Sequence, residues 1–270
     1  GIVDRIWEPD GSNNAFYMTL TRPNYRRVEQ VIVGNGDNAE GHVTEFHYKP
    51  ALDSSVVSRA GNTLSYPYSY DFSARSLVHR VTTSNGLNDG GVFTTDYSYS
   101  DPKIHLSGYG HLGFRTMTTT NVVNGIETTT QYDQDVTSRK HGTITKIKTE
   151  HGNVTLSDTT NTWNTITIGS GASERYRTEL SQNVITKRDL NNAFLNTETN
   201  AFTYNSWGMP ATINTRLYEE SNPTEVRHKS TTHEYTSFNS ADHILPQLNK
   251  STVDVTVTGR PTIRVVNASE

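Results

Sequence analysis

Residues 114–132 read FRTMTTTNVVNGIETTTQY. Two arms rich in threonine and valine flank Asn124-Gly125, and neither arm has apolar residues at the 3.6-residue spacing of an amphipathic helix. Residues with a branched β carbon favour extended strands. An Asn-Gly pair supplies the positive φ angles that a tight type I′ turn needs. We therefore predict a β-hairpin in this stretch.

The same signals recur through the 270 residues of the chain. Asn35-Gly36 and Asn85-Gly86 predict two further chain reversals. A short helix over Ser173–Leu180 is the one helical candidate, and the Asn- and Ser-rich segment Asn153–Ser173 is expected to form a longer loop or a weak strand pair. We expect an all-β chain with helix below about 10% of its residues.

Aromatic residues recur at every second position, which places each set on one face of a strand. These sets are Phe46 and Tyr48; Tyr66, Tyr68 and Tyr70; Tyr97 and Tyr99; and Phe202 and Tyr204. The landmarks Tyr48, Tyr70, Tyr99 and Tyr132 are 22, 29 and 33 residues apart, and Tyr204 and Tyr235 are 31 apart. This irregular period has the size of a hairpin, so the fold class expected is repeated antiparallel hairpins in a large curved or coiled sheet.

Composition and charge limit the classes of protein to which this chain can belong. The hydrophobic fraction of 32% reaches only about 39% when the 19 glycines are added, below the roughly 45–50% of globular domains, so we expect no thick two-layer core. The net charge of −4 and the scattered basic residues make nucleic acid a poor partner. The chain has no cysteine and no run of 18 apolar residues, so neither disulfides nor a membrane-spanning segment are expected.

Several motifs resemble the YD-repeat (RHS-repeat) family, which includes the B components of insecticidal toxin complexes. Tyr132-Asp133 follows a Thr-rich strand, and Tyr70-Asp71 ends an alternating tyrosine set. Gly108–Arg115 resembles a glycine-rich element near such repeat arrays, although the family more often has Arg and Trp at the positions of Tyr109 and His111. Tyr204-Asn205 and Tyr235-Thr236 resemble degenerate repeats, and Leu245-Pro246 with Lys250–Val253 resembles an inter-repeat strand.

This resemblance implies a non-enzymatic structural segment of a toxin shell that encloses a C-terminal effector. It implies a secreted or cell-surface bacterial protein whose partner is the remainder of its own polypeptide or a companion toxin-complex subunit. The self-cleavage motif of the family is not matched, because Asp101-Pro102 is followed by Lys103 without the expected glycine. We expect residues 1–270 to form a single module, and the start at Gly1 suggests a fragment of a larger chain.

The three glycines at positions 108, 110 and 113 formally match a dinucleotide-binding fingerprint, with Asp133 placed 20 residues further on. A phosphate needs a helix N-terminus after the glycines, whereas Phe114–Val123 has the composition of a strand. We expect the glycines to serve a tight turn, with no bound cofactor.

Other candidate sites have simpler explanations. His42 and His47, like His228 and His233, are five residues apart, so the members of each pair should point to opposite faces of a strand. The segments Asp10–Asn14 and Asp189–Asn192 fit Asx turns better than calcium loops. The carboxylate pairs, Glu219 with Glu220 and Asp133 with Asp135, are expected to be solvated. We therefore assign no catalytic, cofactor-binding or metal-ligating residue.

Two functional classes remain open. The first is the structural shell segment, and the second is an autonomous β-rich protein that binds or cleaves carbohydrate. Exposed aromatic side chains on a β face can stack on sugar rings, and the residues that decide are Trp7, Trp163 and Trp207. Two or more of them on one exposed concave face would favour carbohydrate, whereas burial in the aromatic layer would oppose it.

Overall fold

The structure is a computed structural model, and it describes residues 2–6, 14–20, 28–35, 42–61, 64–73, 75–86, 90–219, 222–236 and 246–268. Their regular structure is β-strand, apart from one 3₁₀ turn at Gly171–Ser173. The prediction of an all-β chain is confirmed. The chain divides into two compact units, Gly1–Thr129 and Thr130–Glu270, which are described in turn.

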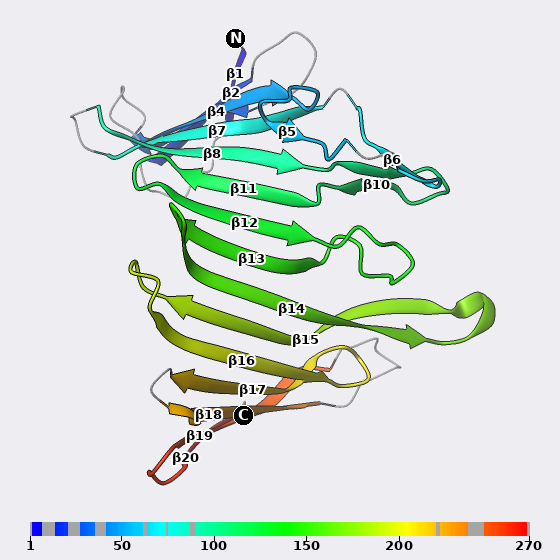
Figure 1. The fold of residues 1–270 in the computed structure, drawn as a ribbon, viewed down its shortest axis with the longest axis vertical. Helices are drawn as coiled ribbons and strands as arrows, with labels where there is room; N and C mark the ends of the chain where they lie inside the picture. Colours follow the sequence, from blue (N-terminus) through cyan, green and yellow to red (C-terminus); the bar gives the residue numbers. More distant parts are fainter. Residues whose placement is uncertain are drawn as a thin grey trace. The chain divides into compact units, whose positions relative to one another are not determined.

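The first unit is built on antiparallel neighbours in the order β1-β2-β3-β4-β7-β8-β11. Figure 1 shows β4, β7, β8 and β11 as successive arrows. Its strands are β1 (Ile2–Ile6), β2 (Asn14–Leu20), β3 (Val28–Asn35), β4 (His42–Pro50), β5 (Val57–Ser58), β6 (Tyr68–Tyr70), β7 (Ser76–Ser84), β8 (Val92–Ser100), β9 (Lys103–His105), β10 (Gly110–Gly113) and β11 (Thr116–Asn121), followed by β12 (Ile126–Tyr132), within which the unit ends. β5 adds a short parallel pairing to β8. A separate sheet has the order β10-β9-β6, and we call it the small sheet.

The second unit is a simple antiparallel meander, in which each strand pairs with the strand before it in the sequence. Its strands are β13 (Ile144–His151), β14 (Val154–Ile168), β15 (Arg175–Arg188), β16 (Phe194–Tyr204), β17 (Pro210–Glu219), β18 (Asn222–Tyr235), β19 (Leu248–Val257) and β20 (Ile263–Ala268). All neighbours from β13 to β20 are antiparallel. In the described part of this unit β13 and β20 do not pair with each other, so its sheet is open.

Two of the three Asn-Gly pairs lie in described turns and reverse the chain as predicted, but with a different turn type at the hairpin that decides the fold. Gly125 has a φ of 68°, whereas the φ of Asn124 is not positive, so the turn is not of type I′. Gly125 N–H instead donates to Asn121 O at 2.8 Å, and the Asn121 side chain accepts from Val123 N–H at 3.0 Å. Asn85-Gly86 reverses the chain between β7 and β8, with Gly86 at φ 74°. Asn35 ends β3, and Gly36 lies outside the described residues.

One expectation about residues 153–180 is wrong, because the expected helix at Ser173–Leu180 is the start of β15. For Asn153–Ser173, where a longer loop or a weak strand pair was expected, the strand alternative holds: most of the segment is β14, a strand of 15 residues that pairs with β13 and β15. Strands β14 and β15 pair from Ile168 with Arg175 to Ser157 with Lys187, with one register shift between Thr162 and Trp163. Cross-strand pairing outweighs the local preference of Asn and Ser for turns, because alternate threonines and isoleucines fit a pleated surface.

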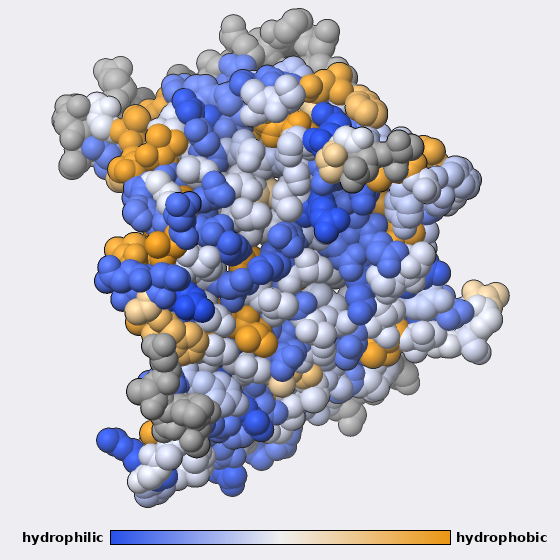
Figure 2. All heavy atoms as spheres, in the orientation of Figure 1, coloured by the Kyte–Doolittle hydropathy of each residue, from blue (hydrophilic) through white to orange (hydrophobic). Residues whose placement is uncertain are grey.

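The sheets enclose little apolar volume. Among the described residues, the buried hydrophobic side chains are Ala51, Val56, Val57, Leu112 and Val136, and of these only Val57 is fully buried. Figure 2 shows mostly hydrophilic and neutral residues on the visible face, with apolar residues in small separate groups. The expectation of a thin core is met, so hydrogen bonding across strands carries much of the specificity of the fold.

Candidate functional site

Four of the landmark tyrosines make the same contact. Each lies at or near the end of a strand and donates its hydroxyl hydrogen to a backbone carbonyl of the preceding hairpin arm. The bonds are Tyr48 to Val28 O (2.7 Å), Tyr99 to Val78 O (2.9 Å), Tyr204 to Leu180 O (2.9 Å) and Tyr235 to Pro210 O (2.8 Å). Burial, with Tyr97 as a smaller cause, raises the pKa of the Tyr99 phenol, which therefore stays protonated as a donor. We call this contact the tyrosine lock.

Three of the locks coincide with a β-bulge in the following strand. Tyr48 pairs with Val78 while His47 pairs with Arg80, so His79 is the extra residue. In the same way Ala211 is extra opposite Tyr204, and Asn249 is extra opposite Tyr235. A bulge re-aims side chains and increases the local twist of a strand. The repeat seen in the sequence is therefore a repeat of local geometry as well as of residue type.

The residue after the tyrosine forms the turn that leaves the strand. A side-chain oxygen of Asp71 accepts from Ser73 N–H at 2.9 Å, that of Asp133 from Asp135 N–H at 2.7 Å, and that of Asn205 from Trp207 N–H at 2.9 Å. Asn can replace Asp here because both offer the same acceptor oxygen to the backbone. Thr236 uses its hydroxyl in a related way and accepts from Gln247 N–H at 2.8 Å.

The glycine-rich element forms the β9–β10 hairpin of the small sheet. Gly108, Gly110 and Gly113 have φ angles of 107°, 70° and 77°, which L-residues rarely adopt. The element leads into β11, a strand, as the sequence predicts. The helix N-terminus that a bound phosphate would need is therefore missing from this described stretch.

An ion pair joins this element to a YD-type motif 40 residues earlier. His111 Nδ1 lies 2.8 Å from Asp71 Oδ2, and the Asp71 side chain is only 13% exposed. Burial acts to raise the pKa of Asp71, but the hydrogen bonds from Ser73 and the charge and hydrogen bond of His111 outweigh it, so the pKa is lowered. Next to this pair, the buried His105 ring lies between Tyr68 and Tyr109, at 5.2 and 5.1 Å between ring centroids.

The tryptophans fall in different environments. Trp163 in β14 is half-buried, and its Nε1–H donates to Ile144 O at 2.8 Å. Trp207, in the turn between β16 and β17, is 51% exposed. Trp7 lies outside the described residues. The indole N–H of Trp163 is thus used within the sheet, which leaves Trp207 as the described tryptophan best placed to meet a ligand.

The other sequence candidates are scattered. His42 and His47 lie on β4, and His228 and His233 lie on β18. In the part of the chain that the structure describes, no group of three or more His, Asp or Glu side chains is placed to hold a metal ion. Asp189 Oδ1 accepts from Asn191 and Ala193 N–H groups, both at 2.8 Å, which confirms the Asx turn.

The remaining acidic candidates divide between the described and undescribed parts of the chain. Asp133 and Asp135 lie in the turn after Tyr132. Glu219 is an exposed residue at the end of β17, and Glu220 lies outside the described residues. The expected Asx turn at Asp10–Asn14 is likewise undescribed, apart from Asn14.

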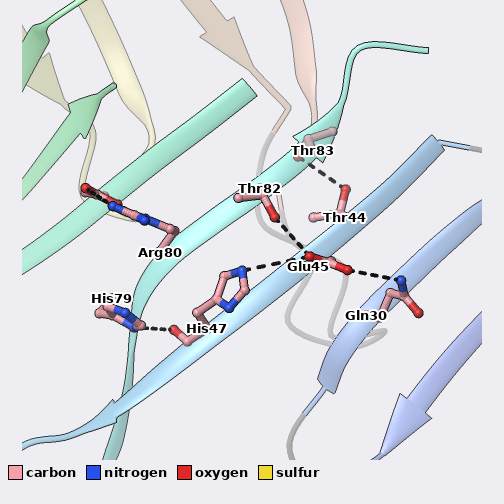
Figure 3. A network of polar contacts seen from close by, with 9 residues as sticks. Gln30, Thr44, Glu45, His47, His79, Arg80, Thr82 and Thr83 are labelled. Atoms are coloured by element: carbon pink, nitrogen blue, oxygen red, sulfur yellow. Dashed lines mark hydrogen bonds and ion pairs between the residues drawn. The ribbon is translucent and has the colours of Figure 1, made fainter. Parts of the chain in front are cut away.

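A polar face on β3, β4, β7 and β8 was not found from the sequence. Glu45 is its centre (Figure 3), with contacts to Gln30 Nε2 (3.4 Å), Thr82 Oγ1 (3.4 Å) and His47 Nε2 (3.9 Å). His79 Nδ1 lies 2.9 Å from His47 O, because the bulge places an extra residue at this point of β7. A shallow groove of about 510 Å³ is lined by Glu29, Gln30, Glu45, Phe46, His47, Tyr48 and His79.

Arg80 continues the polar face on the other side of His79. Its Nε and Nη2 atoms contact the two carboxylate oxygens of Asp96 at 2.5 and 2.8 Å. The Arg80 hydrogen bond is the main cause that lowers the pKa of Asp96. Arg80 and Asp96 thus form a two-point ion pair across β7 and β8, which is typical of a structural contact between strands.

The geometry defines an open sheet of antiparallel hairpins whose strand ends are fixed by tyrosine locks and Asx turns. No family model matches the sequence, and no curated protein matches it. Solved structures do. The chain is similar to the crystal structure of TcdB2-TccC3, an RHS/YD-repeat toxin complex protein, with a TM-score of 0.63 at 10% identity. It is also similar to TcdB2-TccC3-Cdc42, with a TM-score of 0.62 at 10% identity.

Each match covers 90% of this chain but only 16% of the other, so the similarity is to one segment of a much longer protein. The fold expected from the YD-repeat resemblance is thereby confirmed. Among the described residues, no helix is both long and apolar enough to cross a membrane.

Proposed function

We propose that residues 1–270 form a single, non-enzymatic module of a YD-repeat (RHS-type) shell that encloses a C-terminal effector of a secreted bacterial toxin. The observation that carries this proposal is the tyrosine lock, which occurs in both units of the chain. A lock ties the second arm of a hairpin to its first arm, so a hairpin is held together without a thick core and the chain can lengthen by adding hairpins.

The described polar groups support a structural role. Asn200 is buried in β16, where its side chain bonds to Asn183 Oδ1, Glu198 Oε1 and Thr215 Oγ1. Asp96 is paired with Arg80, and Asp71 with His111. Each of these groups is used to join strands, whereas a catalytic acid or base needs contact with a substrate.

The partner in this proposal is the remainder of the same polypeptide or a companion toxin-complex subunit, and the location is outside the bacterial cell. Similarity to a segment of TcdB2-TccC3 supports both. The direct test is proteolysis of a longer polypeptide in which this chain is followed by its natural C-terminal segment. We expect that segment to resist protease while the repeats are folded and to be degraded after the repeats are unfolded with denaturant. Equal degradation in both states would refute enclosure.

Carbohydrate binding is the second candidate, and exposed Trp207 is the observation that favours it. A stacked sugar would quench or shift the fluorescence of this indole. A screen of oligosaccharides against the chain and its Trp207→Ala variant would separate the two candidates. Saturable binding that the substitution abolishes would support the carbohydrate function.

A further inference from the structure

The Asn85-Gly86 pair lies close to a histidine side chain of the neighbouring strand. The His42 ring lies on the side of Gly86 where a side chain would project, with Nε2 2.8 Å from the position that a Cβ atom would occupy. A Cβ atom lies about 2.5 Å from the backbone nitrogen of its own residue, which places His42 Nε2 at most roughly 5.3 Å from Gly86 N. One water molecule can bridge that separation.

The neighbouring strands hold His42 in this place. Val43 N–H donates to Ser84 Oγ at 2.9 Å, and Thr44 Oγ1 lies 3.3 Å from Thr83 Oγ1. The start of β4 is therefore fixed beside the end of β7, one residue before the turn. At Asn124-Gly125, in contrast, the Gly125 N–H is held by Asn121 O at 2.8 Å.

We propose that Asn85-Gly86 is a site of spontaneous deamidation promoted by the His42 imidazole. Asparagine is thermolabile because the next backbone nitrogen can attack its side-chain carbonyl carbon. Here Gly86 N would form a bond to Asn85 Cγ while its proton passes to the imidazole, directly or through water. The side-chain nitrogen then takes a proton and leaves as ammonia. Water opens the resulting succinimide at either carbonyl and gives aspartate or isoaspartate.

The product has a structural consequence at the β7–β8 turn. Aspartate places a carboxylate next to His42, and isoaspartate also adds a methylene group to the backbone of the turn. The amount of either product increases with the age of the molecule. This inference does not depend on the proposed shell function. Gly86 is suited to the attack because, at φ 74° and with no side chain, it leaves room for the imidazole.

The test is peptide mapping by mass spectrometry of the full chain, incubated at neutral pH and 37 °C, with Asn124 as the internal control. We expect Asn85 to deamidate at least about tenfold faster than Asn124, since a positioned base contributes ~10²-fold or more. His42→Ala should remove this advantage, and imidazole added to the buffer should restore it at Asn85 but not at Asn124.

A second measurement keeps the test decisive if the variant does not fold. In urea, the two sites of the unmodified protein should deamidate at similar rates, because unfolding separates His42 from Gly86. The proposal is refuted if Asn85 keeps the same advantage over Asn124 in urea. It is equally refuted if folded His42→Ala deamidates at the original rate.

Discussion

Tyr204 donates its hydroxyl hydrogen to Leu180 O, 2.9 Å away and 24 residues earlier in the chain. The bond joins the end of β16 to the middle of β15, beside the bulge at Ala211. It is one of four such locks, and the acceptors of the other three lie 20, 21 and 25 residues before their tyrosines. The four separations are similar, so each tyrosine closes a hairpin of about the same length.

Tyr204→Phe should destabilise the chain by about 0.5–1.5 kcal/mol, the net value of a typical hydrogen bond. The ring remains, so packing is conserved and only the lock is lost. The matched control is Tyr176→Phe, because the Tyr176 hydroxyl bonds to Glu174 two residues away in an exposed turn. Urea denaturation of both variants measures the difference, and equal midpoints would contradict the structural role of the lock.

Asn200→Asp should be more destabilising than Asn200→Ala at neutral pH. The Asn200 Nδ2 group donates to Asn183 Oδ1 at 2.9 Å and to Glu198 Oε1 at 2.8 Å. A carboxylate at this buried position would face both acceptors without a proton to donate, which costs about 1–3 kcal/mol or more. Thermal unfolding of the two variants tests this, and Asn191→Ala in the exposed turn is the control. Acidification that protonates the introduced carboxylate should recover part of the loss.

Gly208→Ala should be more destabilising than Gly259→Ala. Both glycines have a positive φ, 83° and 78°, so the backbone strain is similar. A Cβ atom at Gly208 would meet the Arg177 side chain at 2.8 Å, whereas nothing lies within 4 Å at Gly259. Arg177 bonds to Ser206 O at 3.2 Å and so supports this turn. The difference in unfolding free energy between the variants isolates that contact, and a difference of zero would show that Arg177 moves aside freely.

Asp71 should make the small sheet sensitive to acid. Its pKa is lowered in the folded chain from an ordinary value of 3.8, so its contribution to stability is present above that value. The contribution is lost as the pH falls through the folded-state pKa, where the carboxylate becomes protonated. Asp71→Asn should flatten the stability profile in this range, as measured by hydrogen exchange of the Tyr68–Tyr70 amides between pH 2 and 5. Identical profiles would exclude Asp71 as the titrating group.

The elements that the sequence predicted well are those with local causes. The hairpin at residues 114–132 follows from its threonines and its Asn-Gly turn, and the spacing of Tyr204 and Tyr235 is that of two consecutive locks. The features that escaped prediction depend on register. His79 joins the polar face only because β7 has a bulge opposite His47 and Tyr48. No residue pattern near His79 predicts that bulge. His111 meets Asp71 across 40 residues, which only the folded chain brings together.

β20 should make the chain self-associate as its concentration rises. Its residues are exposed on both faces, with Val265 50% and Val266 48% exposed, and its described pairing is to β19. An apolar strand with an unprotected edge offers N–H and C=O groups to another strand, and a charged side chain on such a strand prevents this. Val265→Lys should therefore lower the apparent mass by light scattering, while Val123→Lys, a change of equal size in the exposed β11–β12 turn, should not. A chain that remains monomeric at every concentration tested would show that this edge is already protected.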